Sequence, residues 1–585
     1  MKLRQYVRSK PAPFWILTIF LVGLVAIALQ LINLQIVRGP ELAAQGQRIR
    51  LHTSTLEARR GDIVDASGSP LATSLETYHI AVNQRHVKEA KVLRKDKDGK
   101  MQVVGIGPAA VAQQLAPVLG MDEAELGGKL VGESTYQYLK KDVPTETWRA
   151  VRKLNLYGIE WEPSYQRVYP NGSTAASVIG SIDAQGEGNS GLELTQDEQL
   201  KGKPGMLENE YGPTGEVIPG GKSETKPAVN GKTLHTTLRA DLQHSVEEIL
   251  NKTVEKTGAE WGGVVITEVS SGKVLVLADS GNKEITTKPQ TSRIVQSPIE
   301  PGSVGKILTF ATALEQGKIT PLTPIQVPYK YTTADGEEFI DSHEHEQYTR
   351  TTTGVLAESS NTGTVQIGQR VTDAERFETF KKMGLGQATD VPLPGESAGI
   401  LRSPKDWDRR LRYTTMFGQG YSMTQLQQVS MMAAVGNGGV YLPPRLIDGW
   451  TDADGSYHPT EASKPRQAID QKTSQMLTTM LESTLSDEEG TGHWFKVDGY
   501  NIAAKTGTAE LFTNGSHSGI AGSIVGLVPA QKPSIAVSVV LYRPSTGKFA
   551  TDTAGPLFHD VVVESVRSLG VPSSSDSPTL YPTKP

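Results

Sequence analysis

The longest run of apolar residues lies close to the N-terminus. Phe14–Ile32, with the sequence FWILTIFLVGLVAIALQLI, spans 19 residues and contains no charged side chain. A helix of about 20 residues crosses the apolar core of a bilayer, whereas the apolar part of a cleaved signal peptide has only about 7–15. We therefore expect an uncleaved transmembrane helix within residues 11–37. No second run of this length follows, so the pattern predicts a single-pass protein of the plasma membrane.

The charges beside this run indicate its orientation. Four basic residues precede it: Lys2, Arg4, Arg8 and Lys10. Basic residues favour the cytoplasmic end of a membrane helix. Residues 1–10 are therefore expected to form a cytoplasmic tail, and the chain from about residue 38 onward is expected to lie outside the cytoplasm.

Apolar spacing in the second half of the chain indicates a mixed domain. Helical spacing, ended by Gly258, links five residues: Leu242, Val246, Ile249, Leu250 and Val254. Residues 262–279 contain two strand-like runs around a Ser-Ser-Gly turn, and residues 500–544 contain three more. A long helical region separates the two groups. The order predicts an α+β domain over residues 236–568, whose central antiparallel sheet is formed by both ends and flanked by helices.

The first half of the chain is richer in turns. Arg59–Ser74 (RRGDIVDASGSPLATS) has two short apolar runs on either side of a turn that contains glycine, which predicts a hairpin. Residues 38–235 as a whole indicate an elongated, mixed α/β domain without an evident catalytic cluster. The Pro- and Ser-rich tail, residues 569–585, is expected to be disordered.

Composition excludes some classes of function. The formal net charge is -5, so nothing indicates a nucleic-acid partner. The chain has no cysteine, which excludes disulfides, zinc–thiolate sites and cysteine nucleophiles. Asp341–Glu346 (DSHEHE) places His343 and His345 among three carboxylates, a set that could bind a metal. Alternate residues seldom close a metal site without a distant third ligand, so we interpret the segment as a polar loop and expect no metal and no cofactor.

One short segment carries candidate chemistry. Glu300–Phe310 (EPGSVGKILTF) places Ser303 and Lys306 three residues apart at the start of an apolar helical pattern. Residues three apart share one face of a helix, and the helix N-terminus favours developing negative charge. A buried lysine loses its proton more readily and can accept a proton from serine. The phosphate-binding pattern G-x-x-x-x-G-K-[ST] and the hydrolase pattern G-x-S-x-G both fail here.

Two further motifs follow in order. Ser359-Ser360-Asn361 lies in ESSNTG, and Lys505-Thr506-Gly507-Thr508 lies in AAKTGTAE. Ser-x-x-Lys alone occurs by chance in a chain of this size. The three motifs together, the first entering a predicted helix and the third a predicted strand, form the signature of active-serine penicillin-recognising enzymes.

The residue types suit an acyl transfer. Such a reaction needs a nucleophile, a base, an oxyanion site and groups that hold the acyl donor. Ser303 would attack and Lys306 would accept its proton. Ser359 would relay a proton to the leaving amine, and Asn361 would hold a peptide backbone or Lys306. The remaining four residues would bind substrate through a cation, two hydroxyls and an unobstructed strand: Lys505, Thr506, Thr508 and Gly507.

With these motifs in place, the chain resembles the class B penicillin-binding proteins, the monofunctional peptidoglycan D,D-transpeptidases. The resemblance covers about residues 45 to 567. It extends to further segments: RRGDIVDASGSPLA, QRVYPNG, GNSGLELTQDEQLKGKPG, FGQGYSMTQLQ, GNGGVYLPP and GTG. It implies a membrane anchor, a non-catalytic pedestal of the dimerisation type over residues 38–235, and a transpeptidase domain over residues 236–568.

The resemblance also implies a reaction and partners. The substrate would be the D-alanyl-D-alanine end of a peptidoglycan stem peptide, and β-lactams would acylate the same serine. The backbone N–H groups of Ser303 and Thr508 would form the oxyanion hole. A polytopic membrane glycosyltransferase and other proteins of the divisome would be partners, since the pedestal boxes and FGQG favour a cell-division (septal) member.

Some residues depart from the family pattern, and alternatives stay open. LRADLQ replaces the usual entrance to the catalytic domain, Ala504 stands where glycine often precedes the third motif, and Gly305 precedes the lysine of the first. An elongation-type transpeptidase is the nearest alternative. A β-lactamase or D,D-carboxypeptidase follows, in which water releases the acyl-enzyme. The last is a non-catalytic scaffold that binds the cell wall.

Overall fold

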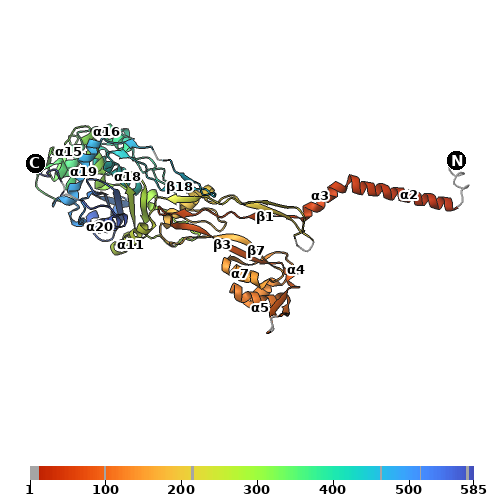
Figure 1. Cartoon of the computed structure of the whole chain (residues 1–585). Coiled ribbons are helices and arrows are strands. Elements are labelled where there is room, and N and C mark those ends of the chain that lie inside the picture. Colours follow the sequence, from red (N-terminus) through yellow and green to blue (C-terminus); the bar gives the residue numbers. More distant parts are fainter. Residues whose placement is uncertain are drawn as a thin grey trace, which may run out of the picture. The chain divides into compact units, whose positions relative to one another are not determined.

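The first described element of the computed structural model is the apolar helix (Figure 1). α2 (Ala12–Ile32) continues into a π-helical turn, η1 (Asn33–Val37), and α3 (Gly39–Arg50) follows. The stretch Ala12–Val37 has a mean hydropathy of 2.6 and is not buried by the rest of the chain, so it is long and apolar enough to cross a membrane. The predicted cytoplasmic tail, residues 1–10, lies outside the described residues. The structure describes residues 12–95, 97, 100–212, 217–461, 464–513, 515–574, 577 and 579–585.

Backbone contacts divide the chain into two compact units that interleave along the sequence. The first contains the described residues up to Arg59 together with Glu76–Gln166 and Lys203–Asn230. The second contains Arg60–Leu75, Arg167–Gly202 and the chain from Gly231 onward. Neither unit is therefore one continuous range of the sequence.

The first unit combines a three-stranded antiparallel sheet, in the order β1-β8-β9, with a second group in which β3 pairs with β6 and β7. α5 has proline in its first turn and ends at Gly120, whose φ of 64° is the left-handed conformation that glycine favours. Apolar residues of α5, α6 and β3 form its core. The strands are β1 (Leu51–Leu56), β3 (Pro70–Val82, shared with the second unit), β4 (Lys91–Lys95), β5 (Met101–Ile106), β6 (Gln137–Pro144), β7 (Ile159–Val168), β8 (Gly205–Glu210) and β9 (Ser223–Lys226). The helices besides α2 and α3 are α4 (Gln84–Val87), α5 (Gly107–Leu119), α6 (Glu123–Leu130) and α7 (Thr145–Leu154).

The second unit is built on a five-stranded antiparallel sheet in the order β12-β11-β23-β22-β21. Two strands come from the start of the unit's long C-terminal segment and three from its end, as the sequence predicts. The strands are β11 (Trp261–Glu268), β12 (Val274–Asp279), β21 (Ala503–Thr513), β22 (Ser516–Val528) and β23 (Ile535–Tyr542). The third sequence motif lies on β21 of this sheet. All three motifs therefore lie in the second unit.

Side-chain alternation along the strands gives the sheet two apolar faces. Val264 and Ile266 of β11 pack in a core with α11 (Ala240–Thr257) and α20 (Ala550–Leu569). Val265, between them, belongs to the core that includes the central helices. Figure 1 labels α11, α18 and α20 around this sheet. The predicted flanking of the sheet by helices is thus confirmed.

The remaining elements of the second unit are short strands and the central helices. The helices are α8 (Ala176–Ile179), α9 (Gly191–Thr195), α10 (Asp197–Leu200), α12 (Arg293–Gln296), η2 (Gly302–Gly305), α13 (Lys306–Glu315), α14 (Thr352–Ala357), α15 (Asn361–Gly368), α16 (Asp373–Lys382), η3 (Pro404–Asp406), α17 (Leu411–Thr414), η4 (Thr415–Phe417), α18 (Gln425–Gly436), α19 (Gln471–Ser486) and η5 (His493–Phe495). The strands are β2 (Ile63–Val64), β10 (Thr233–Thr236), β13 (Pro324–Val327), β14 (Lys330–Thr332), β15 (Glu338–Ile340), β16 (Tyr348–Thr351), β17 (Val440–Tyr441), β18 (Ile447–Thr451), β19 (Tyr457–Pro459) and β20 (Arg466–Gln467).

Three sequence segments from the first half of the chain meet in a buried ionic cluster of the second unit. The Nε atoms of Arg60 and Arg167 each lie 2.7 Å from a carboxylate oxygen of Glu193, and Arg60 also contacts Asp197 at 2.7 Å. The Glu193 side chain is fully buried. The predicted hairpin of Arg59–Ser74 is present as well, because β2 pairs with β3 around a turn that contains Gly68.

The end of the chain differs from the expected disordered tail. α20 ends at Leu569, but Thr583 further on accepts a hydrogen bond at its carbonyl oxygen from the backbone N–H of Thr351. The Thr583 hydroxyl donates to Asp487, and Lys584 forms an ion pair with Glu489. The Pro- and Ser-rich composition predicts disorder, whereas the described part of this segment makes specific polar contacts, and Val571 and Tyr581 pack against the apolar cores.

Candidate active site

The nucleophile candidate lies on a tight turn packed against another backbone segment. Ser303 is partly exposed on the 3₁₀ turn η2, and α13 begins at Lys306. Gly302, at a φ of 53°, donates its N–H to the carbonyl oxygen of Gly418 at 3.0 Å. A Cβ on Gly418 would lie 1.7 Å from the Gly302 oxygen, and one on Gly305 would lie 2.5 Å from the Gly418 Cα. Gly305, a departure from the family pattern, is therefore required by close backbone packing.

The lysine of the first motif is buried and points at the serine. Lys306 has no exposed surface, and its Nζ lies 2.7 Å from Ser303 Oγ and 2.7 Å from Asn361 Oδ1. The same Nζ donates to the Ser359 carbonyl oxygen at 2.9 Å and lies 3.2 Å from the Ser359 hydroxyl. Burial lowers the pKa of Lys306 to about 7, against a smaller opposing effect from the charge of Asp341. The amine is therefore positioned and tuned to accept the Ser303 proton near neutral pH.

The second motif lies between two short helices. Ser359 follows α14 and adopts a φ of 64°, which is uncommon for a residue other than glycine. Ser360 caps α15 by accepting the N–H of Gly363 at 3.0 Å, so Asn361 becomes the first residue of that helix. This arrangement directs both side chains of the motif, from Ser359 and Asn361, at the Lys306 amine.

The third motif lies on β21, the strand at one end of the sheet. Lys505 is fully buried, and its Nζ donates to the Ser359 hydroxyl at 2.9 Å, so that hydroxyl lies between the two lysines. Burial, with a further effect of the charge on Lys306, lowers the pKa of Lys505 well below its ordinary value. Thr506 donates its hydroxyl to Thr491, and the Thr508 hydroxyl accepts the N–H of Ala550.

Close packing is a second reason for glycine at Gly507, in addition to the unobstructed strand expected from the sequence. A Cβ at this position would lie 2.4 Å from the Pro301 carbonyl oxygen and 2.8 Å from the Ser523 hydroxyl. A Cβ on Gly302 would likewise lie 2.6 Å from the Thr508 oxygen. Glycine therefore lets β21 lie directly beside the turn that carries Ser303, which brings the backbones of Ser303 and Thr508 together.

All eight residues predicted for the site fall in one unit, and the contacts above link the three motifs. Sequence reasoning gave no role in the site to Asp341, Gly418 or Thr491, although the last two lie in the FGQG and GTG segments. The segment that contains Asp341 was interpreted only as a polar loop, yet its carboxylate accepts the backbone N–H groups of Asn361 and Thr362. His345 lies 3.2 Å from Asp341, and no group of three His, Asp or Glu side chains among the described residues is arranged to hold a metal.

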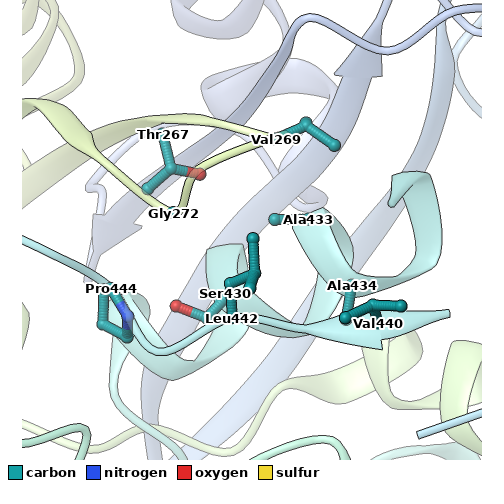
Figure 2. Close-up of a pocket in the computed structure, with 9 residues that line it drawn as sticks. All are labelled: Thr267, Val269, Gly272, Ser430, Ala433, Ala434, Val440, Leu442 and Pro444. Carbon is teal, nitrogen blue, oxygen red and sulfur yellow. The ribbon is translucent and has the colours of Figure 1, made fainter. Parts of the chain in front are cut away.

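A small pocket lies elsewhere in the second unit (Figure 2). It is lined by residues of β11 and α18 and of the turns next to them, including Thr267, Gly272 and Ser430. Its volume is about 10 Å³, enough for roughly one water molecule and too small for a substrate. None of the motif residues lines it, so the pocket is separate from the site at Ser303.

Comparison with known proteins identifies the two domains of the chain. Residues 262–562 match the model of the penicillin-binding protein transpeptidase domain, and residues 55–236 match the penicillin-binding protein dimerisation domain. The penicillin-binding protein PbpB of Mycolicibacterium smegmatis is 31% identical over 582 residues, which cover 94% of this chain and 89% of that protein.

Solved structures give the same result. A peptidoglycan synthetase from Bifidobacterium adolescentis is 35% identical with a TM-score of 0.75, and the match covers 92% of this chain and 100% of the other. Penicillin-binding protein 3 from Mycobacterium tuberculosis, complexed with aztreonam, is 26% identical with a TM-score of 0.68, covering 91% of this chain and 100% of the other. The chain therefore belongs to the penicillin-binding protein transpeptidase family, as a class B member that combines a dimerisation domain with a transpeptidase domain.

Proposed function

We propose that this membrane-anchored chain is a peptidoglycan D,D-transpeptidase that cross-links stem peptides through an acyl-enzyme on Ser303. The single observation that carries the assignment of roles is the 2.7 Å approach of the buried Lys306 amine to Ser303 Oγ. A base within hydrogen-bond reach of a hydroxyl, with a pKa near neutrality, is what nucleophilic serine chemistry requires.

The acylation step follows from these contacts. Lys306 Nζ takes the Ser303 proton while Ser303 Oγ bonds to the carbonyl carbon of the penultimate D-alanine. The C–N bond to the terminal D-alanine breaks, and its nitrogen receives a proton from Lys306 through the Ser359 hydroxyl, which lies 3.2 Å from Lys306 Nζ. In the second step the amine of another stem peptide attacks the ester carbon and gives up a proton to Lys306. The new amide forms and Ser303 is released with its proton restored.

Substrate binding is assigned to β21. Lys505 would hold the terminal carboxylate, which supplies the counter-charge that the buried amine lacks and so favours its protonated form. Thr506 and Thr508 would offer hydroxyls, and the strand would pair with the extended peptide. The backbone N–H groups of Ser303 and Thr508 would bind the developing oxyanion. β-Lactams would enter by the same contacts, which the aztreonam complex of the relative from M. tuberculosis supports.

The cellular setting is also part of the proposal. The basic N-terminal residues support a cytoplasmic N-terminus, with the catalytic unit on the outer side of the plasma membrane. The pedestal boxes and the FGQG segment support a septal role beside a polytopic glycosyltransferase and other divisome proteins. Elongation-type synthesis is the alternative, and depletion of the protein distinguishes them: filamentous cells support the septal role, and rounded cells oppose it.

Intact-mass spectrometry of the full chain in detergent micelles, after exposure to a fluorescent penicillin, tests the enzymatic roles. One adduct that persists for hours and is lost in Ser303→Ala is the expected result. A transient adduct with turnover of the drug would indicate a hydrolase instead. No adduct on the folded protein would indicate a non-catalytic scaffold.

A further inference from the structure

Asp341 is a buried carboxylate directly behind the second motif. It follows β15, donates its backbone N–H to the Tyr329 carbonyl oxygen at 3.0 Å, and is 6% exposed. A carboxylate loses its hydration on burial and is stable there only when hydrogen bonds replace the lost water. The hydrogen bonds of Asp341 therefore indicate the role of its carboxylate.

Both carboxylate oxygens are directed at the start of α15. Oδ1 accepts the backbone N–H groups of Asn361 at 2.5 Å and Thr362 at 3.0 Å. Oδ2 accepts the hydroxyls of Ser360 at 2.8 Å and Thr362 at 3.2 Å. The segment next to Asp341 adds a fifth contact to the motif, since Asn361 Nδ2 donates to the Ile340 carbonyl oxygen. Asp341 thus fixes two successive residues of the Ser-Ser-Asn motif and the residue that follows.

His345 supports the carboxylate from the other side. Its Nε2 lies 3.2 Å from Asp341 Oδ2, and its Nδ1 lies 2.8 Å from the carbonyl oxygen of Glu346. Both ring nitrogens therefore face acceptors. The imidazole also packs against the ring of Tyr348, at 4.7 Å between centroids. These contacts keep Asp341 in one orientation.

This restraint is important because Ser359 has an unfavourable backbone conformation. A non-glycine residue in the left-handed region is strained and persists only when its surroundings hold it there. The Ser359 carbonyl oxygen and hydroxyl both contact the Lys306 amine, and Asn361 Oδ1 contacts it too. If the backbone after Ser359 relaxed, these three acceptors would leave Lys306 together.

Asp341 also acts on Lys306 by its charge. Burial lowers the pKa of Lys306 to about 7, and the negative charge of Asp341 acts in the opposite direction. The titratable groups that face this pair are Lys505, His345 at Asp341 Oδ2, and Tyr348. Burial and the charge on Lys306 lower the pKa of Lys505, whereas burial and nearby carboxylates, Asp341 among them, raise the pKa of Tyr348. Removing the Asp341 charge should therefore lower the pKa of Lys306 further.

We propose that Asp341 is the positioning residue of this active site and that its hydrogen bonds hold the Ser359–Asn361 segment against Lys306. The inference rests on the proposed function, in which Ser303 is the nucleophile and Lys306 its base. Asp341 touches no reacting atom; it acts through Ser359 and Asn361.

The test measures the second-order rate of acylation by a fluorescent penicillin as a function of pH, on the full chain in detergent micelles. Asp341→Asn keeps the shape of the side chain and removes its charge. Glu344→Gln removes the same charge from an exposed position of the same segment and is the matched control. Asp341→Ala removes all the hydrogen bonds, and melting curves verify that each variant is folded.

Asp341→Asn should lower the plateau rate by about tenfold, since an amide replaces one acceptor oxygen with a donor, and should move the midpoint of the pH profile to lower pH. Asp341→Ala, if folded, should lose about a hundredfold through misplacement of the motif. Glu344→Gln should match the parent protein. An unmoved midpoint in Asp341→Asn would overturn the proposal even if the plateau fell, because loss of packing alone gives that result.

Failure of this inference differs from failure of the proposed function. If Ser303→Ala remains unacylated while Asp341→Asn behaves as the parent protein, only the positioning role is wrong. If Ser303→Ala is acylated at the normal rate, the proposed nucleophile is wrong, and the positioning role falls with it.

Discussion

Two buried clusters of cations in the second unit have opposite properties. In the ionic cluster, Arg60 and Arg167 each contact a carboxylate oxygen of Glu193 at 2.7 Å. In the catalytic cluster, the amines of Lys306 and Lys505 contact only hydroxyl, amide and carbonyl oxygens among the described residues. The first cluster places a carboxylate in direct contact with each cation, and the second does not.

This difference determines how each cation responds to burial. Burial alone would lower the pKa of Arg60, but Glu193 and Asp197 raise it above its ordinary value. Burial lowers the pKa of Lys306 to about 7, where the neutral amine is accessible. Burial by itself therefore stabilises the charged form of the side chains in neither cluster. With a carboxylate partner the cation stays charged and serves as a structural cross-link, whereas without one the amine can lose its proton near neutral pH, as a general base must.

The largest effect is expected from removing the catalytic amine. Lys306→Met keeps a side chain of similar length and should lower the rate of penicillin acylation by about 10²–10⁴-fold, the usual contribution of a general base. Its melting temperature should be unchanged or higher, because a buried amine without a counter-charge is lost. Rapid-quench acylation assays and calorimetry check both results. Acylation within tenfold of the parent protein would contradict the assignment of the base.

The ionic cluster should respond in the reverse way. Arg60→Met leaves Glu193 buried with Arg167 as its remaining guanidinium partner, and should lower the free energy of unfolding by about 3–5 kcal/mol. Acylation by the protein that stays folded should not change. Chemical denaturation measures the loss, with the exposed Arg402→Met as control. A loss of acylation at full stability would show that the two clusters are not separate in role.

Displacement of the nucleophile turn gives an intermediate effect. An alanine at Gly418, where φ is 92°, would place its Cβ 1.7 Å from the Gly302 oxygen. Gly418→Ala should move the turn that carries Ser303 and slow acylation by about a hundredfold. Gly455→Ala is the matched control, because φ is 89° there but the added Cβ meets no atom within 4 Å. Equal acylation by the two variants would mean that close packing at Gly418 does not position the serine.

The C-terminal segment should give the smallest effect. Thr583→Val removes the hydroxyl that donates to Asp487 and should lower the free energy of unfolding by about 1 kcal/mol. Differential scanning calorimetry can detect this change, with the exposed Thr579→Val beside it. Identical melting curves for the two variants would mean that the contact contributes nothing in solution.

Much of this site could be predicted because its chemistry lies in short motifs. Ser303 and Lys306 lie three residues apart, and the helical pattern after them places both at a helix start. The antiparallel sheet follows from strand-like runs at both ends of the domain. The motif residues could therefore be assigned to one site from the sequence alone.

What could not be predicted depends on contacts between distant segments. Asp341 lies in a segment with no apolar period, and only the folded backbone places it behind Asn361. From the sequence, Gly305 is only a departure from the family pattern. In the structure, its close packing against Gly418 explains why glycine is needed there. The polar composition of the last residues gave no sign that Thr583 would bind beside Thr351. For Asp341 the decisive feature is a buried carboxylate, and in the other two cases it is the close approach of two backbone segments. Neither feature leaves a periodic pattern in the sequence.

The assignment of Lys306 as the base for Ser303 depends on its burial. The most direct test is the rate of penicillin acylation of the full chain between about pH 5 and about pH 9, with Lys306→Met as reference. Because the neutral amine is the active form, the rate should rise about tenfold per pH unit below a midpoint near 7 and be level above it. A rate that is independent of pH throughout, or that keeps rising beyond about pH 9 as for an ordinary lysine, would contradict this assignment.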